Sequence, residues 1–141
     1  MMGFTVKRLG TGDEALLRSI APDVFDEPVD PARLHDYLRT PGHIMVLAFE
    51  GDLVVGQCAA VVHRHPDKST ELYVDEVGTA STHRRRGIAR AMMDEMFRWG
   101  RELGCDEAWL GTELDNDPAN GLYRGYRPLE DEAIQYYLFR L

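Results

Sequence analysis

The sequence predicts a single α/β domain with a mixed, mostly antiparallel central sheet and helices on both faces. Three observations carry this prediction. The 141 residues suit one ordinary domain over 1–141. Apolar, β-branched runs follow one another across residues 44–77 with short turns between them, and from Ile88 to Leu103 the apolar spacing becomes helical. Hairpin strands followed by strand, helix and strand are typical of an α/β sheet.

The first third of the chain predicts a strand, a helix, a loop and a second helix. Residues 4–9 favour a short strand, and residues 13–20 a helix that begins after a cap region. Three prolines mark residues 21–31 as a loop, and residues 32–38 favour a helix that ends before Pro41. This proline-rich, acidic loop is expected to cover a site.

The remaining elements follow from apolar, β-branched runs, which indicate strands, and from apolar residues at steps of three and four, which indicate helices. Two apolar runs around the turn Gly51-Asp52 indicate a β-hairpin, and a third strand follows directly. The expected elements are strands over 44–50, 53–62 and 71–77, a helix over 88–104, a strand over 107–112, a short helix over 119–123 and a last strand over 133–141.

Composition narrows the class of protein. The chain is 44% hydrophobic and 28% charged, which is close to the soluble globular average and predicts a packed core. No apolar run approaches the roughly 20 residues of a membrane span, and the start lacks a signal-peptide pattern, so a cytoplasmic location is expected. Cys58 and Cys105 lack metal-ligand spacing and are expected to be buried free thiols. No metal is expected.

Charge points to one local anion site. A net charge of -8 argues against a nucleic-acid surface and favours a cationic partner. Against this acidic background, four arginines gather within seven positions, at Arg84, Arg85, Arg86 and Arg90.

These arginines lie where a predicted strand turns into a predicted helix. The first backbone N–H groups of a helix lack partners and the helix dipole is positive there, so an anion meets several donors at once. Gly87 and Ala89 keep the backbone approachable. The pattern predicts a pyrophosphate cradle, and the alternative is a solvated helix start.

The hexad Arg84-Arg85-Arg86-Gly87-Ile88-Ala89 resembles the acetyl-CoA signature of the GNAT acyltransferase superfamily. The resemblance covers about residues 71–126, including the strand before the hexad, the long helix after it and the later pattern Asn116, Ala119, Leu122, Tyr123. The segment from Glu71 through the hexad also looks like the aminoglycoside 3-N-acetyltransferase branch. The family's spacer before a Gly-aromatic pair is missing after Tyr123, so that helix is expected to be a turn short.

The resemblance implies acetyl-CoA as cofactor, held by a splayed strand pair. Val77 and Thr79 would pair through their backbone with the pantetheine arm. Gly78 would mark a bulge, since a strand glycine often marks a kink or a close backbone approach, and a kink there would splay the strand over 107–112; the alternative is simple packing. Main-chain N–H groups of the hexad would hold the pyrophosphate, helped by arginine side chains. The implied contacts are Val77, Gly78, Thr79, Arg84, Arg85, Arg86, Gly87, Ile88, Ala89, Asn116, Ala119 and Tyr123.

Transfer of an acyl group from a thioester to an amine requires a base for the amine and an acid for the thiolate. Tyr123 is the expected acid, because a phenol is protonated at neutral pH, and the alternative is a tyrosine packed under the cofactor. Glu76 is the expected base, directly or through water, and the alternative is that it only orients a cationic substrate. A bulge at Gly78 or one residue earlier would exchange Glu76 with Asp75. His83 suits a cap or a phosphate neighbour better than a base.

The expected acceptor is the primary amine of a small cationic molecule, with an aminoglycoside-like compound as one sub-case, because the loop and C-terminal segments are acidic. The alternatives are a protein N-acetyltransferase and a non-catalytic acyl-CoA sensor. The apolar residues 134–139 allow either a homodimer or a strand buried within one subunit. Neither nucleic acid nor membrane is an expected partner.

Overall fold

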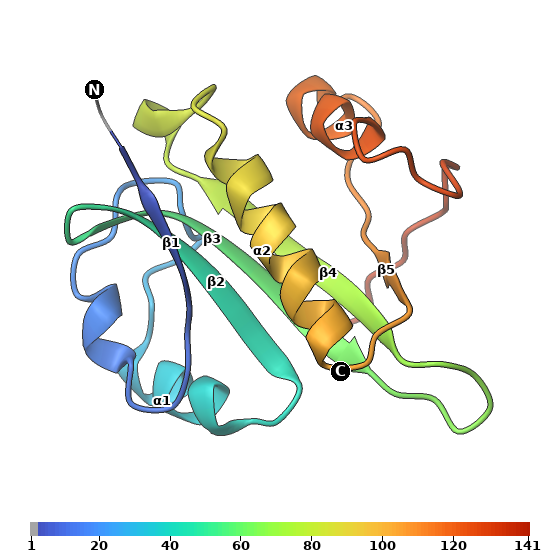
Figure 1. Cartoon of the computed structure of the whole chain (residues 1–141), viewed down its shortest axis with the longest axis horizontal. Helices are drawn as coiled ribbons and strands as arrows, with labels where there is room; N and C mark the ends of the chain where they lie inside the picture. Colours follow the sequence, from blue (N-terminus) through green and yellow to red (C-terminus); the bar gives the residue numbers. More distant parts are fainter. Residues whose placement is uncertain (1–2) are drawn as a thin grey trace. The chain divides into compact units, whose positions relative to one another are not determined.

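The computed structural model describes residues 3–141, and the chain divides into two compact units, Met1–Leu110 and Gly111–Leu141. The first unit holds a five-stranded open sheet in the order β1-β2-β3-β4-β5 (Figure 1). The pairs β1–β2, β2–β3 and β3–β4 are antiparallel, whereas β5 runs parallel to β4. The strands are β1 (Thr5–Arg8), β2 (His43–Glu50), β3 (Leu53–His63), β4 (Glu71–Thr79) and β5 (Glu107–Trp109).

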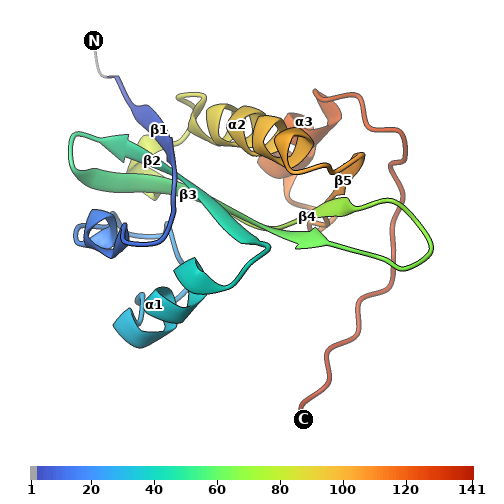
Figure 2. The ribbon, with the colours of Figure 1, turned by 60° about the horizontal axis from the view of Figure 1, so that its bottom comes forward.

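Helices cover both faces of this sheet, as the sequence predicts (Figure 2). Helix α2 (Ile88–Glu102) lies on one face and buries its apolar stripe there, including Met92 and Met96. Helix α1 (Pro31–Arg39) and the short 3-10 helix η1 (Glu14–Leu17) lie on the other face. A second short 3-10 helix, η2 (Ser81–His83), links β4 to α2.

The core sits between the central strands and α2. Apolar residues of β2 and β3 such as Leu47 and Val54 have no exposed surface, because both faces of these strands are covered. Gly56 allows this close packing, since a β-carbon there would lie 2.8 Å from the tip of Met92. At the sheet edge Arg8 reaches from β1 to α2, with Nε 2.6 Å from Glu95 and Nη1 2.8 Å from Glu102.

Two predicted elements of the first unit are shorter than expected. The helix over 13–20 is only the single turn η1, because the chain after it bonds to β3: Ala21 N donates to Val54 O at 2.9 Å. The strand over 107–112 is reduced to three residues. The hairpin strands and α2 begin and end within two residues of their predicted limits, which confirms the periodicities that predict them.

The second unit contains helix α3 (Asp117–Arg124), which is longer than the predicted 119–123. The predicted last strand over 133–141 is wrong. The unit, all of which is described, contains no strand that could pair with this segment, and a strand without a partner leaves its backbone groups unsatisfied. Its apolar side chains are exposed instead, at 72–81% for Ile134, Tyr136, Tyr137, Leu138 and Phe139.

Among the described helices, none combines the length and the apolar character that crossing a membrane requires.

Candidate functional site

The basic turn between η2 and α2 is shaped to receive an anion. Arg85 and Gly87 adopt left-handed backbone conformations, with φ of +64° and +79°. Gly87 caps α2 without a side-chain hydrogen bond, and a β-carbon on it would meet no atom within 4 Å. The helix starts at Ile88, so the N–H groups of its first turn lack intrahelical partners and face an open approach. This is the geometry of a phosphate-binding helix start.

One carboxylate fastens the turn to the sheet. Glu50, at the end of β2, receives Nη1 of Arg86 at 3.2 Å and lies 3.1 Å from Nε2 of His83. His83 is buried and its other ring nitrogen lies 2.7 Å from the Thr82 hydroxyl. The contact with His83, followed by Arg86, lowers the pKa of Glu50. His83 therefore acts as a tether of the turn, which agrees with its predicted role near the cradle rather than as a base.

The three arginines of the turn are not equivalent. Arg86 is engaged with Glu50, whereas Arg84 and Arg85 are exposed and make no ion pair with any residue that the structure describes. The two unpaired guanidinium groups leave their donors for a ligand. Arg84 and Arg85 are thus better placed than Arg86 to contact phosphate oxygens.

Strand β4 loses one neighbour partway along its length. It pairs with β5 only from Glu71 to Tyr73, where Tyr73 stacks on Trp109 with ring centroids 4.1 Å apart. From Val74 to Thr79 it pairs only with β3, so this edge has no strand partner among the described residues. The predicted splay is therefore present, and the backbone of Val77, Gly78 and Thr79 lies on the open stretch.

The irregularity that accompanies the splay is not at Gly78. Gly78 lies in regular register opposite Gln57, whereas Asp75 is an extra residue: Val74 pairs with Ala60 and Glu76 with Ala59. The prediction of a bulge at Gly78 is wrong, and the alternative, a role in packing, is what the structure shows, in the form of a close backbone approach. A β-carbon on Gly78 would lie 2.2 Å from Val24 O, a backbone atom, so only glycine fits.

The extra residue in β4 brings Glu76 to the side of the sheet where Gln57 lies. Nε2 of Gln57 donates to Glu76 Oε1 at 2.9 Å and lies 3.3 Å from Val24 O. Burial raises the pKa of Glu76, as do Asp26 and Asp75, while the hydrogen bond from Gln57 opposes the shift. A carboxylate held in place with a raised pKa accepts a proton more readily than an ordinary carboxylate, which suits it to act as a general base.

Sequence reasoning missed Gln57. Its side chain is fully buried, and its Oε1 has no hydrogen-bond partner among the described residues. Its signal in the sequence is a long polar side chain in the middle of an apolar strand, since buried polar groups in such positions are normally satisfied by specific partners. Here those partners are Val24 and Glu76.

The acidic loop over 21–31 divides into structural and available carboxylates. Asp30 caps α1 by accepting a hydrogen bond from Arg33 N at 2.9 Å. Asp26 is exposed and lies near enough to Glu76 to raise the pKa of that group. Of these two carboxylates, Asp26 is the one free to meet a cation beside Glu76.

The second unit carries three further predicted residues on or before α3. Asn116 caps the helix, with Oδ1 accepting from Ala119 N at 3.3 Å. Tyr123 lies in the last turn and is partly buried. Asn116 and Ala119 are thus brought together, and Asn116 fixes where the helix that carries Tyr123 begins.

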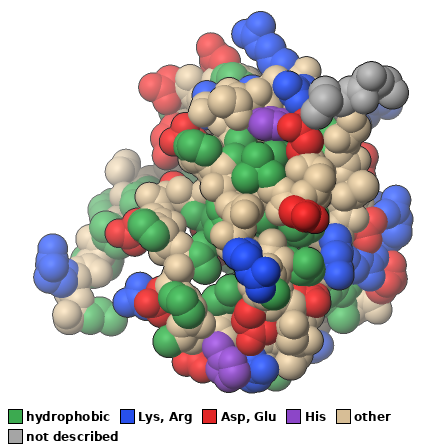
Figure 3. Space-filling model, turned by 90° about the vertical axis from the view of Figure 1, so that its left-hand side faces the viewer, with side chains coloured by type: hydrophobic (Ala, Val, Ile, Leu, Met, Phe, Trp, Pro, Cys, Tyr) green, Lys and Arg blue, Asp and Glu red, His purple; other side chains and the backbone are tan. Residues whose placement is uncertain are grey.

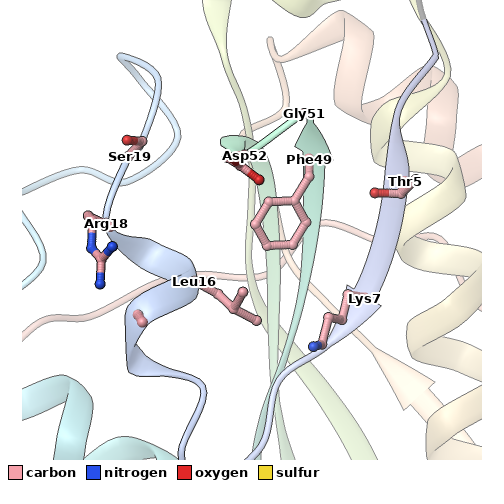
Figure 4. A pocket seen from close by; sticks show the side chains of 9 residues that line it. Thr5, Lys7, Leu16, Arg18, Ser19, Phe49, Gly51 and Asp52 are labelled. Atoms are coloured by element: carbon pink, nitrogen blue, oxygen red, sulfur yellow. The ribbon is translucent and has the colours of Figure 1, made fainter.

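Two pockets of the first unit contain none of these residues. One of about 530 Å³ lies beside β1, β2 and η1, where the ring of Phe49 lies between Leu16 and Lys7 (Figure 4). The other, of about 770 Å³, lies between η1 and α1. On the face shown in Figure 3, acidic and basic side chains are interspersed rather than gathered into fields of one sign.

The first unit thus defines a class of α/β domain that binds a phosphate-bearing ligand at a helix start, beside a strand edge left open by splaying. The acetyltransferase (GNAT) family model matches residues 14–126. The chain belongs to the acetyltransferase (GNAT) family, which confirms the family that the hexad predicts.

Curated relatives point to the same family. The aminoglycoside N(6′)-acetyltransferase type 1 of Serratia marcescens is 23% identical over 111 residues, or 75% of this chain and 76% of the relative. The L-2,4-diaminobutyric acid acetyltransferase of Oceanobacillus iheyensis is 31% identical over 61 residues, or 43% of this chain and 33% of the relative. The chain spans only a third of that relative's length, and about half of the probable N-acetyltransferase san of Drosophila melanogaster.

A solved structure confirms the predicted fold. An aminoglycoside acetyltransferase from an uncultured soil metagenomic sample, in complex with trehalose, superposes with a TM-score of 0.85 at 18% identity, covering 98% of this chain and 96% of that chain. The aminoglycoside enzyme from Serratia marcescens carries the 6′ designation, so the 3-N branch that the sequence resembles stays a prediction.

Proposed function

We propose that this protein is an acetyl-CoA-dependent N-acetyltransferase that acts on a primary amine of a small cationic molecule. The observation that carries the proposal is the basic turn, with its unpaired N–H groups and the free Arg84 and Arg85, directly after the open edge of β4. Because the chain belongs to the acetyltransferase (GNAT) family, acetyl-CoA is the anion that we assign to this site.

The described residues fit coenzyme A. The N–H groups of the hexad from Arg84 to Ala89 would hold the pyrophosphate, with Gly87 keeping the approach open. The open edge at Val77, Gly78 and Thr79 offers backbone groups to an extended amide-bearing arm. A related aminoglycoside acetyltransferase was crystallised with coenzyme A, which supports this assignment. Acetyl-CoA supplies an activated acyl group as a thioester.

The chain's own residues handle the protons. Glu76 would accept the proton that the amine loses as the bond from nitrogen to the acyl carbon forms. Tyr123 would donate a proton to the sulfur as the carbon–sulfur bond breaks, and Asn116 and Ala119 would support the cofactor beside it. The raised pKa of Glu76 supports its part of this proposal.

A small cationic acceptor fits the carboxylates around Glu76. Asp26 and Asp75 flank it, and both raise its pKa, so a protonated amine entering there would meet concentrated negative charge. Two relatives act, by their names, on aminoglycosides and on 2,4-diaminobutyric acid, which are both amine-bearing small molecules. An aminoglycoside-like acceptor is one form of this proposal, and a cytoplasmic location goes with it.

We further propose a homodimer, because the exposed apolar side chains over 134–139 gain most by burial against a second copy. Light scattering coupled to size exclusion tests it. A dimer that becomes a monomer when Tyr137 and Phe139 are both changed to Ser supports the proposal, and a monomeric parent protein overturns it.

The test of the enzymatic proposal is thiol release from acetyl-CoA against aminoglycosides, polyamines and lysine peptides. Turnover on one small-amine class, lost in the double variant Arg84→Ala, Gly87→Glu, is the expected result. Arg101→Ala, at the other end of α2, is the matched control and should keep full activity. Turnover on peptides alone would make the protein a protein acetyltransferase, and thermal stabilisation by acetyl-CoA without turnover would make it a sensor.

A further inference from the structure

The β3–β4 hairpin brings together three side chains that the proposed function does not use. His63 ends β3, Glu71 begins β4, and the two are register partners across the hairpin. His65 follows two residues after His63, with its Nε2 2.8 Å from Glu71 Oε1. The three side chains can each offer one ligand atom, and these atoms lie within 4.8 Å of one another.

We propose that His63, His65 and Glu71 form a binding site for a divalent transition-metal ion of the zinc class. Two imidazoles and one carboxylate are a ligand set that zinc accepts, with a fourth position left to water. Because the set contains no thiolate, it does not favour soft metal ions. Its two imidazole nitrogens favour Zn²⁺, Cu²⁺ and Ni²⁺ over Mg²⁺ and Ca²⁺, which prefer ligand sets made of oxygen.

The geometry requires only small movements. A tetrahedral ion about 2.0–2.2 Å from each ligand keeps its ligand atoms roughly 3.4 Å apart. The His65–Glu71 contact has to open slightly, and His63 has to rotate inward. The rings of His63 and His65 already lie side by side, with centroids 4.2 Å apart and planes tilted by 39°, so the two imidazoles are gathered in one place.

Burial also favours an ion here. The side chains of His65 and Glu71 are only 14% and 24% exposed, so they are held rather than free in solvent. Lys68, which is exposed in the hairpin turn, lies close to Glu71, and its positive charge opposes an ion.

This site is separate from the proposed active site. Glu71 and Thr79 are the two ends of β4, roughly 25 Å apart at about 3.3 Å per residue. The ion would therefore join the two strands of the hairpin where they diverge, without contacting the basic turn or Glu76. Its expected effect is to hold the hairpin closed, which stabilises the fold by linkage.

The first readout is calorimetric titration of ZnCl₂ into untagged, EDTA-treated protein. One ion per chain with a micromolar dissociation constant is expected, together with a rise of several degrees in melting temperature. His65→Ala and Glu71→Gln should each weaken binding at least tenfold. His35→Ala is the matched control, because His35 also lies 3.2 Å from a glutamate, Glu14, yet forms no such cluster with the residues that the structure describes.

The second readout reports position. Trp109 lies on β5, opposite Tyr73 of β4, and Glu107 of the same strand lies opposite Glu71. Trp109 is therefore two residues, or about 7 Å along the strand, from the level of the site. Paramagnetic Cu²⁺ should quench Trp109 fluorescence in a Trp99→Phe background, and excess Zn²⁺ should restore it. His63→Ala should abolish the quenching.

Circular dichroism checks that each variant folds. If a histidine variant does not fold, Glu71→Gln, which keeps the shape of the side chain, still tests whether the cluster binds the ion. Binding that is absent in the parent protein overturns the proposal. So does binding that survives unchanged in both His65→Ala and Glu71→Gln.

Discussion

The two ends of strand β4 differ in what surrounds them. At its start, Glu71 to Tyr73 pair with strands on both sides, and Tyr73 stacks on Trp109. At its end, Val77 to Thr79 pair on one side only and lead into the basic turn. The division falls between Tyr73 and Val74, and Asp75, the extra residue of the strand, follows directly after it. An inserted residue thus lies next to the point where a stretch closed by pairing gives way to a stretch open to a ligand.

The largest expected effect at the open end is on Glu76. Glu76→Gln keeps the shape of the side chain but removes the base, so kcat should fall by about 10²–10³-fold. Because its pKa is raised above the ordinary value of 4.5, the parent enzyme should be active while the group is ionised and lose activity as the pH falls through that raised pKa. Steady-state kcat measured across pH checks both statements.

Asp75→Asn is the matched control for this prediction, since it removes a neighbouring carboxylate of the same bulge. It should lower the pKa of Glu76 and shift the acid limb to lower pH while retaining most of kcat. A Glu76→Gln enzyme within threefold of the parent would show that Glu76 only orients the substrate.

The next effect is on stability, and it tests the crowding at the open end. In Gly78→Ala the new β-carbon would lie 2.2 Å from Val24 O, a backbone atom, so the loop or the strand has to move. The expected loss is about 2–4 kcal/mol of unfolding free energy. Urea denaturation measures it.

Gly56→Ala on the neighbouring strand is the comparison for Gly78→Ala. Its new β-carbon would lie 2.8 Å from the tip of Met92, a flexible side chain that can shift, and 3.0 Å from Ile88 Cγ2, both side-chain atoms rather than backbone, so the expected loss is smaller, about 1–2 kcal/mol. Equal losses at the two glycines would mean that the Val24 segment gives way as easily as a methionine tip.

A smaller effect is expected from the arginines of the basic turn. The double variant Arg84→Ala, Arg85→Ala removes two side chains that make no ion pair within the described residues, so stability should be unchanged. The KM for acetyl-CoA should rise by about 5–20-fold, because charge-assisted hydrogen bonds to phosphate are lost. Arg86→Ala should instead lower the melting temperature, since it frees Glu50. An unchanged KM in the double variant would contradict the proposed cradle.

The comparison of the two ends of β4 also shows what the sequence can predict. The hexad at Arg84 to Ala89 was sufficient to predict the basic turn, since it depends on neighbours in the chain. The bulge at Asp75 could not be predicted, because it is set by the register against β3 and not by residue type. Gly78 was expected to be special, but only the fold shows that Val24 is the reason.

The other differences have the same origin in long-range contacts. The last segment, 133–141, has the composition of a strand, yet it forms none because a strand also needs a partner. The pairing of His63 with Glu71 likewise depends on the length of the hairpin turn, although the spacing of His63 and His65 is visible in the sequence. Local signals therefore predicted the elements, and pairing decided their limits and their chemistry.

The smallest expected effect distinguishes the two cysteines. Cys58 lies beside the open end of β4, and Cys105 lies near its paired end. Cys58 lies on β3 opposite Val77, has no exposed surface, and burial raises its pKa to about 12. Cys105 precedes β5, close to the paired end of β4, and is partly exposed. The thiolate is the reactive form, so in native protein at pH 8 a disulfide reagent should modify one thiol per chain, Cys105.

Cys105→Ser should abolish this native labelling, and denaturant should expose the second thiol in the parent protein. Rapid modification of Cys58 in the folded protein would mean that the packing over this face of β3 opens, because a strand side chain points to a face of the sheet and Cys58 has no exposed surface there. Since Cys58 lies opposite Val77, that outcome would show that the sheet beside the free edge of β4 is mobile before a ligand binds.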